Sequence, residues 1–320
     1  MWKTVLRRVL VMIPQLFILS ILIFILAKKM PGDPFTGLIT PQTSPAVLEE
    51  LRRKAGFYDP WHVQYIRWMG NAFKGNFGMS YTYKLPVSTL IGQRVNNTFI
   101  LSLFSMILTY MLAIPLGVLS GRYQNSLLDR GVTLYNYVSY TIPTFVLSLI
   151  MVWFFGYTLG WFPTTGSVTI GLTPGTFKYF IDRIHHILLP AITYALLATT
   201  GTIQYLRNEI IDAKSLDYVK TARSKGVPEN VVYSRHIFRN SILPIAAFFG
   251  YSITGLLSGS IFIERIFSYP GMGNLFISSI GSRDYSVVTA LILLFGFLTL
   301  IGSLLSDIIL SIVDPRIRIE

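Results

Sequence analysis

The chain has 320 residues, of which 52% are hydrophobic and 13% charged, and its mean hydropathy is +0.54. A soluble domain carries about 25% charged residues, so this composition excludes an ordinary water-soluble enzyme. The formal net charge of +12 invites a nucleic-acid interpretation, but in a membrane protein an excess of Lys and Arg first serves orientation and contact with anionic lipid.

Six apolar stretches predict an all-α integral membrane protein with six transmembrane helices. Each is long enough to cross about 30 Å of hydrocarbon as a helix. The first follows Lys3, Arg7 and Arg8 and has no small-residue cleavage site after it, which favours a retained signal anchor. Only the sixth holds a charged residue, Asp307. The stretches lie near 9–27, 99–120, 134–157, 187–206, 241–263 and 287–313.

The distribution of Lys and Arg predicts that both termini are cytoplasmic. With six crossings, 14 basic residues fall on one side and four in the short loops of the other. Basic residues gather on the cytoplasmic side, so the side with 14 is assigned to the cytoplasm. We therefore divide the chain into residues 1–27, a cytoplasmic N-terminus with the first helix; 28–98, an extracytoplasmic segment; and 99–320, a five-helix core with a cytoplasmic loop at 207–240.

The segment 28–98 predicts a small, partly helical cap with an aromatic patch at Trp61, Tyr65 and Trp68. Packing at the membrane interface explains these aromatics better than ligand stacking, because Trp and Tyr concentrate at such interfaces. Further along, Pro115, Pro143 and Pro190 lie in or at the ends of predicted spans, and each can kink its helix.

The sequence contains none of the common catalytic or nucleotide-binding motifs that we considered. It has no P-loop, no dinucleotide fingerprint, no HExxH and no GxSxG elbow. It also has no cysteine, and no cluster of intramembrane acids or histidines that would hold a metal or relay protons. No catalytic residue, metal site or cofactor is therefore assigned to this chain. For Asp307 we expect a structural polar contact, with water or an arginine as its partner.

The fifth stretch has one small, weakly polar face, because Gly250, Thr254 and Ser258 recur every four residues. Close helix packing and the lining of a solute pathway both explain such a face. An uncharged lining suits a solute that must be released again. The predicted pathway-lining residues are Thr200, Gln204, Tyr251, Thr254 and Ser258.

The loop 207–240 carries seven basic and four acidic residues and is longer than a turn requires. It predicts two helices: Ser215 or Asp217 caps the first, Gly226 ends it, and Pro228 opens the second. A short amphipathic helix must bury its apolar side, and the membrane surface is one place to do so. That side is formed by Tyr218, Val219 and Ala222.

The string DYVKTARSKG followed by RHIFRNSILP resembles the EAA loop, the coupling loop of permease subunits of ATP-binding-cassette importers, in its peptide-importer form. Further strings resemble the first permease subunit of oligopeptide and dipeptide importers, in the same order along the chain. They are LRRVLVMIPQLFILS, PGDPF, FSYPGMGNLF with RDYS, and VDPR.

This resemblance implies the type I importer permease fold, in the plasma membrane of a prokaryote. It implies a peptide substrate, a homologous second permease subunit, two ATPase subunits that bind ATP and Mg, an extracytoplasmic peptide-binding protein and surrounding membrane lipid; nucleic acid is not expected. Lys220, Thr221 and Ala222 match the family's Glu-Ala-Ala, and two of the three differ from it. The implied ATPase-coupling residues are Asp217, Tyr218, Lys220, Thr221, Ala222, Arg223, Lys225 and Gly226.

Two other functions are open from the residues alone. One is a membrane scaffold or anchor whose basic loop binds anionic lipid or a partner, without transport. The other is a membrane-embedded hydrolase, for which the sequence supplies no catalytic pair.

Overall fold

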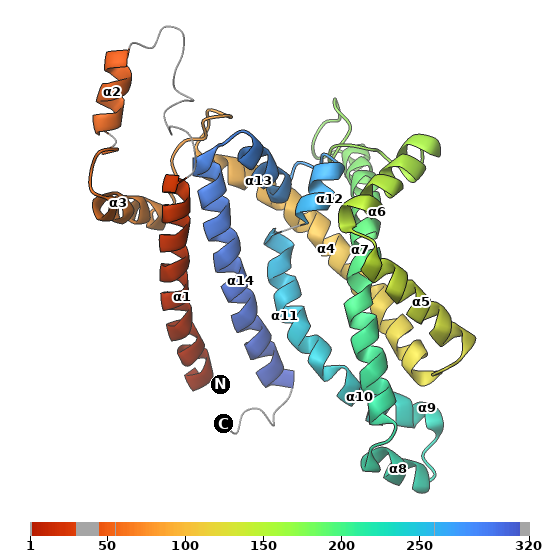
Figure 1. Cartoon of the computed structure of the whole chain (residues 1–320). Helices are drawn as coiled ribbons and strands as arrows, with labels where there is room; N and C mark the ends of the chain where they lie inside the picture. The colour runs from red at the N-terminus through yellow and green to blue at the C-terminus, as the bar shows by residue number, and fades with distance from the viewer. Residues whose placement is uncertain (1, 30–44, 55, 259, 314–320) are drawn as a thin grey trace.

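The structure, a computed structural model, describes residues 2–29, 45–54, 56–258 and 260–313, so PGDPF and most of VDPR lie outside it. The described residues form a helical bundle without a β-strand, as predicted (Figure 1). Four helices have the length and hydropathy to cross a membrane, and a bent pair of helices makes a fifth candidate. The four are α1 (Trp2–Lys29), α4 (Val87–Arg122), α7 (Phe177–Ala213) and α14 (Tyr285–Val313).

The bent pair replaces the predicted third span. α5 (Leu127–Thr141) and α6 (Thr144–Met151), which continues as the π-helix η2 (Val152–Thr158), meet at an angle of 103°. Pro143 causes the break, because it precedes α6 and disfavours helical geometry at Ile142, which is extended (φ −78°, ψ 120°). The stretch predicted near 134–157 is therefore a broken helix, and the kink expected at Pro143 is present. α4 and α7 run on through Pro115 and Pro190.

α4 and α7 start about ten residues before the predicted spans at 99 and 187. With 36 and 37 residues at about 1.5 Å each, they are roughly 55 Å long, well beyond a hydrocarbon core of about 30 Å. The early turns of α4 are held by packing, since Val87 and Leu90 are buried in a cluster with side chains of α13 (Met272–Gly281) and α14. Apolar windows therefore underestimate both helices.

α4 and α7 pack closely along one side. A Cβ atom on Gly117 would lie 3.1 Å from Cβ of Leu206, and one on Gly121 would lie 2.9 Å from Cβ of Ile210. Glycine at both positions lets the two backbones approach, as small residues do between membrane helices.

The predicted fifth span is shorter than expected. α11 (Leu243–Ser258) has 16 residues, and Ser260 then precedes the short α12 (Ile261–Ile266). The face with Gly250 packs on α14, where a Cβ on Gly250 would lie 2.3 Å from the backbone nitrogen of Ser306. Thr254 lies against Gly302 on the same helix. Gly250 and Thr254 therefore serve close helix packing in this structure.

Short helices cover the two ends of the bundle (Figure 1). At one end, where α1 begins and α14 finishes, lie α8 (Asp217–Ser224), α9 (Glu229–Val231), η3 (Val232–Ile237) and α10 (Phe238–Ser241). At the other end lie α12 and α13. Beside them are α2 (Pro45–Lys54) and α3 (Trp61–Phe73), which supply the helical part expected of residues 28–98.

Asp307 makes the structural polar contact that we expected. Nε of Arg8 lies 2.9 Å from Oδ2 of Asp307, and Nη2 donates to Oδ1 at 3.2 Å. The pair joins α14 to the first turns of α1, at the end of the bundle that holds α8.

A buried carboxylate organises the opposite end. Glu264 of α12 has no exposed surface; its Oε1 accepts a hydrogen bond from Thr98 Oγ1 at 2.9 Å, and its Oε2 accepts one from the backbone N–H of Asn274 at 3.0 Å. A Cβ on Gly271 would lie 2.4 Å from that Oε2. Gly271, the first glycine in FSYPGMGNLF, therefore makes room for the carboxylate at the start of α13.

We expect Glu264 to make stability depend on pH. Burial raises the pKa of Glu264 to about 7, although hydrogen bonds from Asn274 and Thr98 act in the opposite direction. The folded state then favours the protonated form, so the free energy of unfolding is highest in acid and falls as the pH rises through 7. Thermal unfolding in detergent between pH 5 and pH 8 measures this slope. Glu264→Gln should flatten it, whereas Glu50→Gln, at an exposed acid, should not; equal slopes in Glu264→Gln and the parent protein would contradict the assignment.

Two glycine substitutions should change the free energy of unfolding in opposite directions. Gly250→Ala places a methyl group against the backbone of α14, and overpacking of this kind costs about 1–3 kcal/mol. At Gly201 of α7 a Cβ meets no atom within 4 Å, so Gly201→Ala should stabilise by about 0.5–1 kcal/mol through helix propensity. Unfolding in mixed micelles titrated with sodium dodecyl sulfate measures both, and equal changes would show that α11 does not pack on α14 in this way.

Candidate functional site

α8 forms where the sequence predicts it, but its start differs. Leu216 precedes the helix, and no side chain caps it. Ser215 donates instead to the carbonyl of Asp212 at the end of α7, and Asp217 pairs with Lys220 at 3.0 Å. The prediction of a Ser215 or Asp217 cap was wrong because both side chains have other partners. Asp217 still favours the start of the helix through its charge.

The end of α8 is as predicted. Gly226 has φ +73°, a left-handed conformation that glycine adopts without strain. Its N–H donates to the carbonyl of Arg223, and the N–H of Val227 donates to the carbonyl of Ala222 at 3.2 Å. These two bonds make a Schellman motif. Pro228 then precedes α9, as expected.

The apolar side of α8 is buried inside the chain. Val219 and Ala222 are 0% and 6% exposed, in a cluster with Leu206 and Ile210 of α7 and Val232 of η3. The idea that this side rests on the membrane surface was therefore wrong. Tyr218, expected on the same side, is instead 38% exposed.

The outward side of α8 is polar and basic. Among the implied coupling residues, only Ala222 is turned inward, so its contribution is to hold the helix in place. The exposed residues are Asp217, Tyr218, Lys220, Thr221, Arg223, Lys225 and Gly226.

Ion pairs and ring contacts fix the loop on the bundle. Arg223 bonds Glu229 through two nitrogens, at 2.7 and 3.2 Å, across the turn at Gly226. The bond from Arg223 holds the pKa of Glu229 below its usual value, but both side chains are partly exposed, so solvent screens the pair. The guanidinium of Arg122, at the end of α4, lies 4.7 Å from the ring centre of Tyr233. Lys214 donates to the carbonyl of Arg122 at 3.0 Å.

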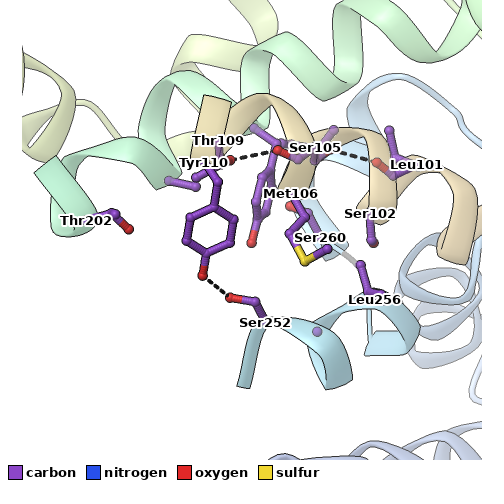
Figure 2. A pocket seen from close by; sticks show the side chains of 14 residues that line it. Leu101, Ser102, Ser105, Met106, Thr109, Tyr110, Thr202, Ser252, Leu256 and Ser260 are labelled. Atoms are coloured by element: carbon purple, nitrogen blue, oxygen red, sulfur yellow. Dashed lines mark hydrogen bonds between the residues drawn. The ribbon is translucent and has the colours of Figure 1, made fainter. Parts of the chain in front are cut away.

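A second feature is a cavity of about 340 Å³ between α4, α7, α11 and the start of α12. None of the fourteen described residues that line it is charged. Figure 2 shows Tyr110 of α4 reaching Ser252 of α11, and their hydroxyl oxygens are 2.9 Å apart. The hydroxyls in the lining are Ser102, Ser105, Thr109, Tyr110, Tyr194, Thr202, Ser252 and Ser260.

Some of these hydroxyls are already bonded to their own helix. Ser105 donates to the carbonyl of Leu101 at 2.8 Å, and Thr109 donates to that of Ser105 at 2.7 Å. Such internal bonds satisfy polar side chains within a membrane helix. The described part of the wall is therefore wettable and carries no charge that would hold a solute tightly.

The predicted pathway-lining residues are not brought together at this cavity. Thr200 is buried, Gln204 is exposed on α7, and Thr254 packs on α14; none of the three lines the cavity. Tyr251 and Ser258 belong to α11, but their side chains lie outside the part of the chain that the structure describes. That these five residues line a transport path stays a prediction.

An ion pair that we did not predict joins α5 to α7 beside the loop. Oδ1 of the buried Asp129 accepts from Nε of Arg207 at 2.6 Å, and Oδ2 accepts from Nη2 at 2.9 Å. Ser120 and the N–H of Asn125 also donate to this carboxylate. The sequence carried one signal for it: Ser126, three residues before Asp129, is a helix N-cap pattern, and its hydroxyl accepts from the N–H of Asp129.

Known families and relatives match this chain over nearly its whole length. Residues 113–319 match the family described as the inner membrane component of binding-protein-dependent transport systems, and residues 1–104 match the N-terminal region described for the same kind of component. The chain is 42% identical over 315 residues to the oligopeptide transport system permease protein AppB of Bacillus subtilis (strain 168), covering 98% of both chains. It is 32% identical over 319 residues to the glutathione transport system permease protein GsiC of Salmonella paratyphi A, covering 99% of both. The chain therefore belongs to the family of binding-protein-dependent transport system inner membrane components.

Proposed function

We propose that this chain is the permease subunit of an ATP-driven peptide importer in the plasma membrane. Its relatives are named for oligopeptide and glutathione transport, which supports a short peptide as the substrate. In this proposal the chain carries no covalent chemistry. It forms half of the translocation path, with a homologous second permease subunit as the other half, and an extracytoplasmic binding protein delivers the peptide.

The outward side of α8 is the observation on which the proposal rests most. A membrane permease without a nucleotide-binding motif needs ATPase subunits on separate chains. α8 presents Lys220, Arg223 and Lys225 at one end of the bundle, on a helix whose apolar side is already buried. A docked ATPase subunit would therefore contact a preformed polar surface.

The proposal includes six crossings, with both termini and α8 in the cytoplasm. α11 is counted as the fifth crossing, although its 16 residues span only about 24 Å. The excess of Lys and Arg on the α8 side supports the orientation. The uncharged cavity then lies within the membrane, where its hydroxyls offer the weak contacts that let a peptide pass.

Cross-linking tests whether α8 is the docking surface. Lys220→Cys introduces a single thiol, because the chain has no cysteine of its own. In membranes containing the whole transporter, this thiol should cross-link to a P-loop ATPase, identified by mass spectrometry. Lys74→Cys, exposed just after α3, is the matched control and should not. Capture from Lys74→Cys alone, or from neither position in a complex that hydrolyses ATP, would overturn the docking role.

A second experiment tests the turn that ends α8. Gly226→Val forces a β-branched residue into a left-handed conformation, at a cost of roughly 1–2 kcal/mol or more, whereas Gly226→Asn tolerates it better. We expect Gly226→Val to abolish peptide uptake while the chain still inserts, and Gly226→Asn to retain much of it. Uptake of labelled peptide at matched membrane levels measures this, and equal uptake by the two variants would contradict a role for the turn.

A further inference from the structure

A second cavity, of about 520 Å³, lies between α1, α3 and the start of α14, and none of its described lining residues lines the uncharged cavity. Of its fourteen described lining residues, seven are aromatic. The proposed function leaves this cavity without a role. Its depth, its charge and the surface that leads away from it define what it can bind.

The cavity lies at the edge of the membrane. Lys28 is in the last turn of α1, and Tyr285 is the first residue of α14, so two candidate spans end at its wall. The third wall, α3, exposes Trp61, Ile66 and Phe73 to 57%, 67% and 86%. A short helix with such exposed apolar side chains beside a span is typical of the membrane interface. The cavity therefore lies at the depth of the lipid headgroups.

Among the described residues that line the cavity, Lys28 is the one cation without a carboxylate partner. The other charged residue of this set, Arg67, is paired with Asp59 at 2.6 Å. Lys28 donates to Oε1 of Gln64, and no carboxylate of the described residues lies within ion-pair distance of it. A half-buried cation without a counterion attracts an anion.

The wall around Lys28 is shaped for a group that is polar on one side and apolar on the other. Its Nζ lies 5.9 Å from the ring centre of Phe24 and 5.2 Å from that of Phe57. The ring of Trp68 is 6.1 Å from that of Phe24. The phenylalanine rings give this wall an apolar side, and the N–H of Trp68 and the Lys28 ammonium give it polar groups, a combination typical of the membrane interface.

An apolar surface continues from the cavity toward the membrane interior. Leu10, Ile13 and Phe17 fall on the same face of α1 as Phe24 and Lys28 by the helical repeat. These three side chains are 55% to 59% exposed. A molecule with its anionic group at Lys28 would lay a hydrocarbon chain along this row.

We propose that this cavity binds one phospholipid with a singly charged anionic headgroup, whose phosphodiester pairs with Lys28 and whose acyl chain lies along α1. The bound lipid contacts α1, α3 and α14, which together line the cavity. Its site is separate from the peptide path and does not depend on the substrate assignment.

Native mass spectrometry of the full-length, delipidated chain in neutral detergent tests the proposal. The probes are dioleoylphosphatidylglycerol, dioleoylphosphatidylcholine and glycerol 3-phosphate. We expect tight binding of one phosphatidylglycerol and much weaker binding of the other two. Lys28→Gln should weaken phosphatidylglycerol binding roughly fivefold to tenfold, as removal of one interfacial cation does. The matched control Lys29→Gln removes the same charge from an exposed neighbour outside the cavity and should change binding less than about twofold.

A second variant keeps the charge and fills the space. Ser286→Phe adds a ring to the cavity wall on α14 and should also weaken phosphatidylglycerol binding, which decides the matter if Lys28→Gln does not fold. Equal losses in Lys28→Gln and Lys29→Gln, equal affinity for phosphatidylcholine, or unchanged binding by Ser286→Phe would each overturn the proposal. Equally tight binding of glycerol 3-phosphate would make this a site for soluble anions and would overturn it as well.

Discussion

The close contact between α4 and α7 is the constraint on which the other features depend. These are the two longest helices, and Gly117 and Gly121 bring their backbones together. The uncharged cavity is bounded by both helices midway along them, and α8 follows directly from the end of α7. Thr98, in the first third of α4, bonds Glu264 of α12. Shifting α4 against α7 would change all three at once.

Polar groups are arranged according to depth along this axis. Ionised partners meet near the ends of helices, as in Arg8 with Asp307 and Arg207 with Asp129. Midway along α4, Ser105 and Thr109 are hydroxyls that bond to their own backbone. Hydrocarbon offers no hydrogen bonds, so each polar group there must be satisfied locally or within a cavity that water can enter.

The sequence predicted the parts of the fold that local properties decide. Hydropathy located α1 and α14, and glycine chemistry located the end of α8. Pro143 indicated a kink but not its angle of 103°, and the apolar windows missed the early starts of α4 and α7, because a bend angle and a helix beyond the apolar window depend on tertiary packing. The candidate site was harder: periodicity identified the small face of α11, but which neighbour a face meets is a property of the bundle, and Thr254 meets α14.

Because Val219 and Ala222 are buried, the side chains of α8 fall into two sets with different roles. One set holds the helix on its own subunit, and the other, which includes Lys220, Thr221 and Arg223, faces outward. Substitutions at Lys220 and Thr221 leave the inward packing and the pair of Arg223 with Glu229 intact, so this outward surface is free to diverge without loss of the fold. In the proposed docking role, the packed side of α8 keeps the helix in place while its outward side chains decide which ATPase subunit binds.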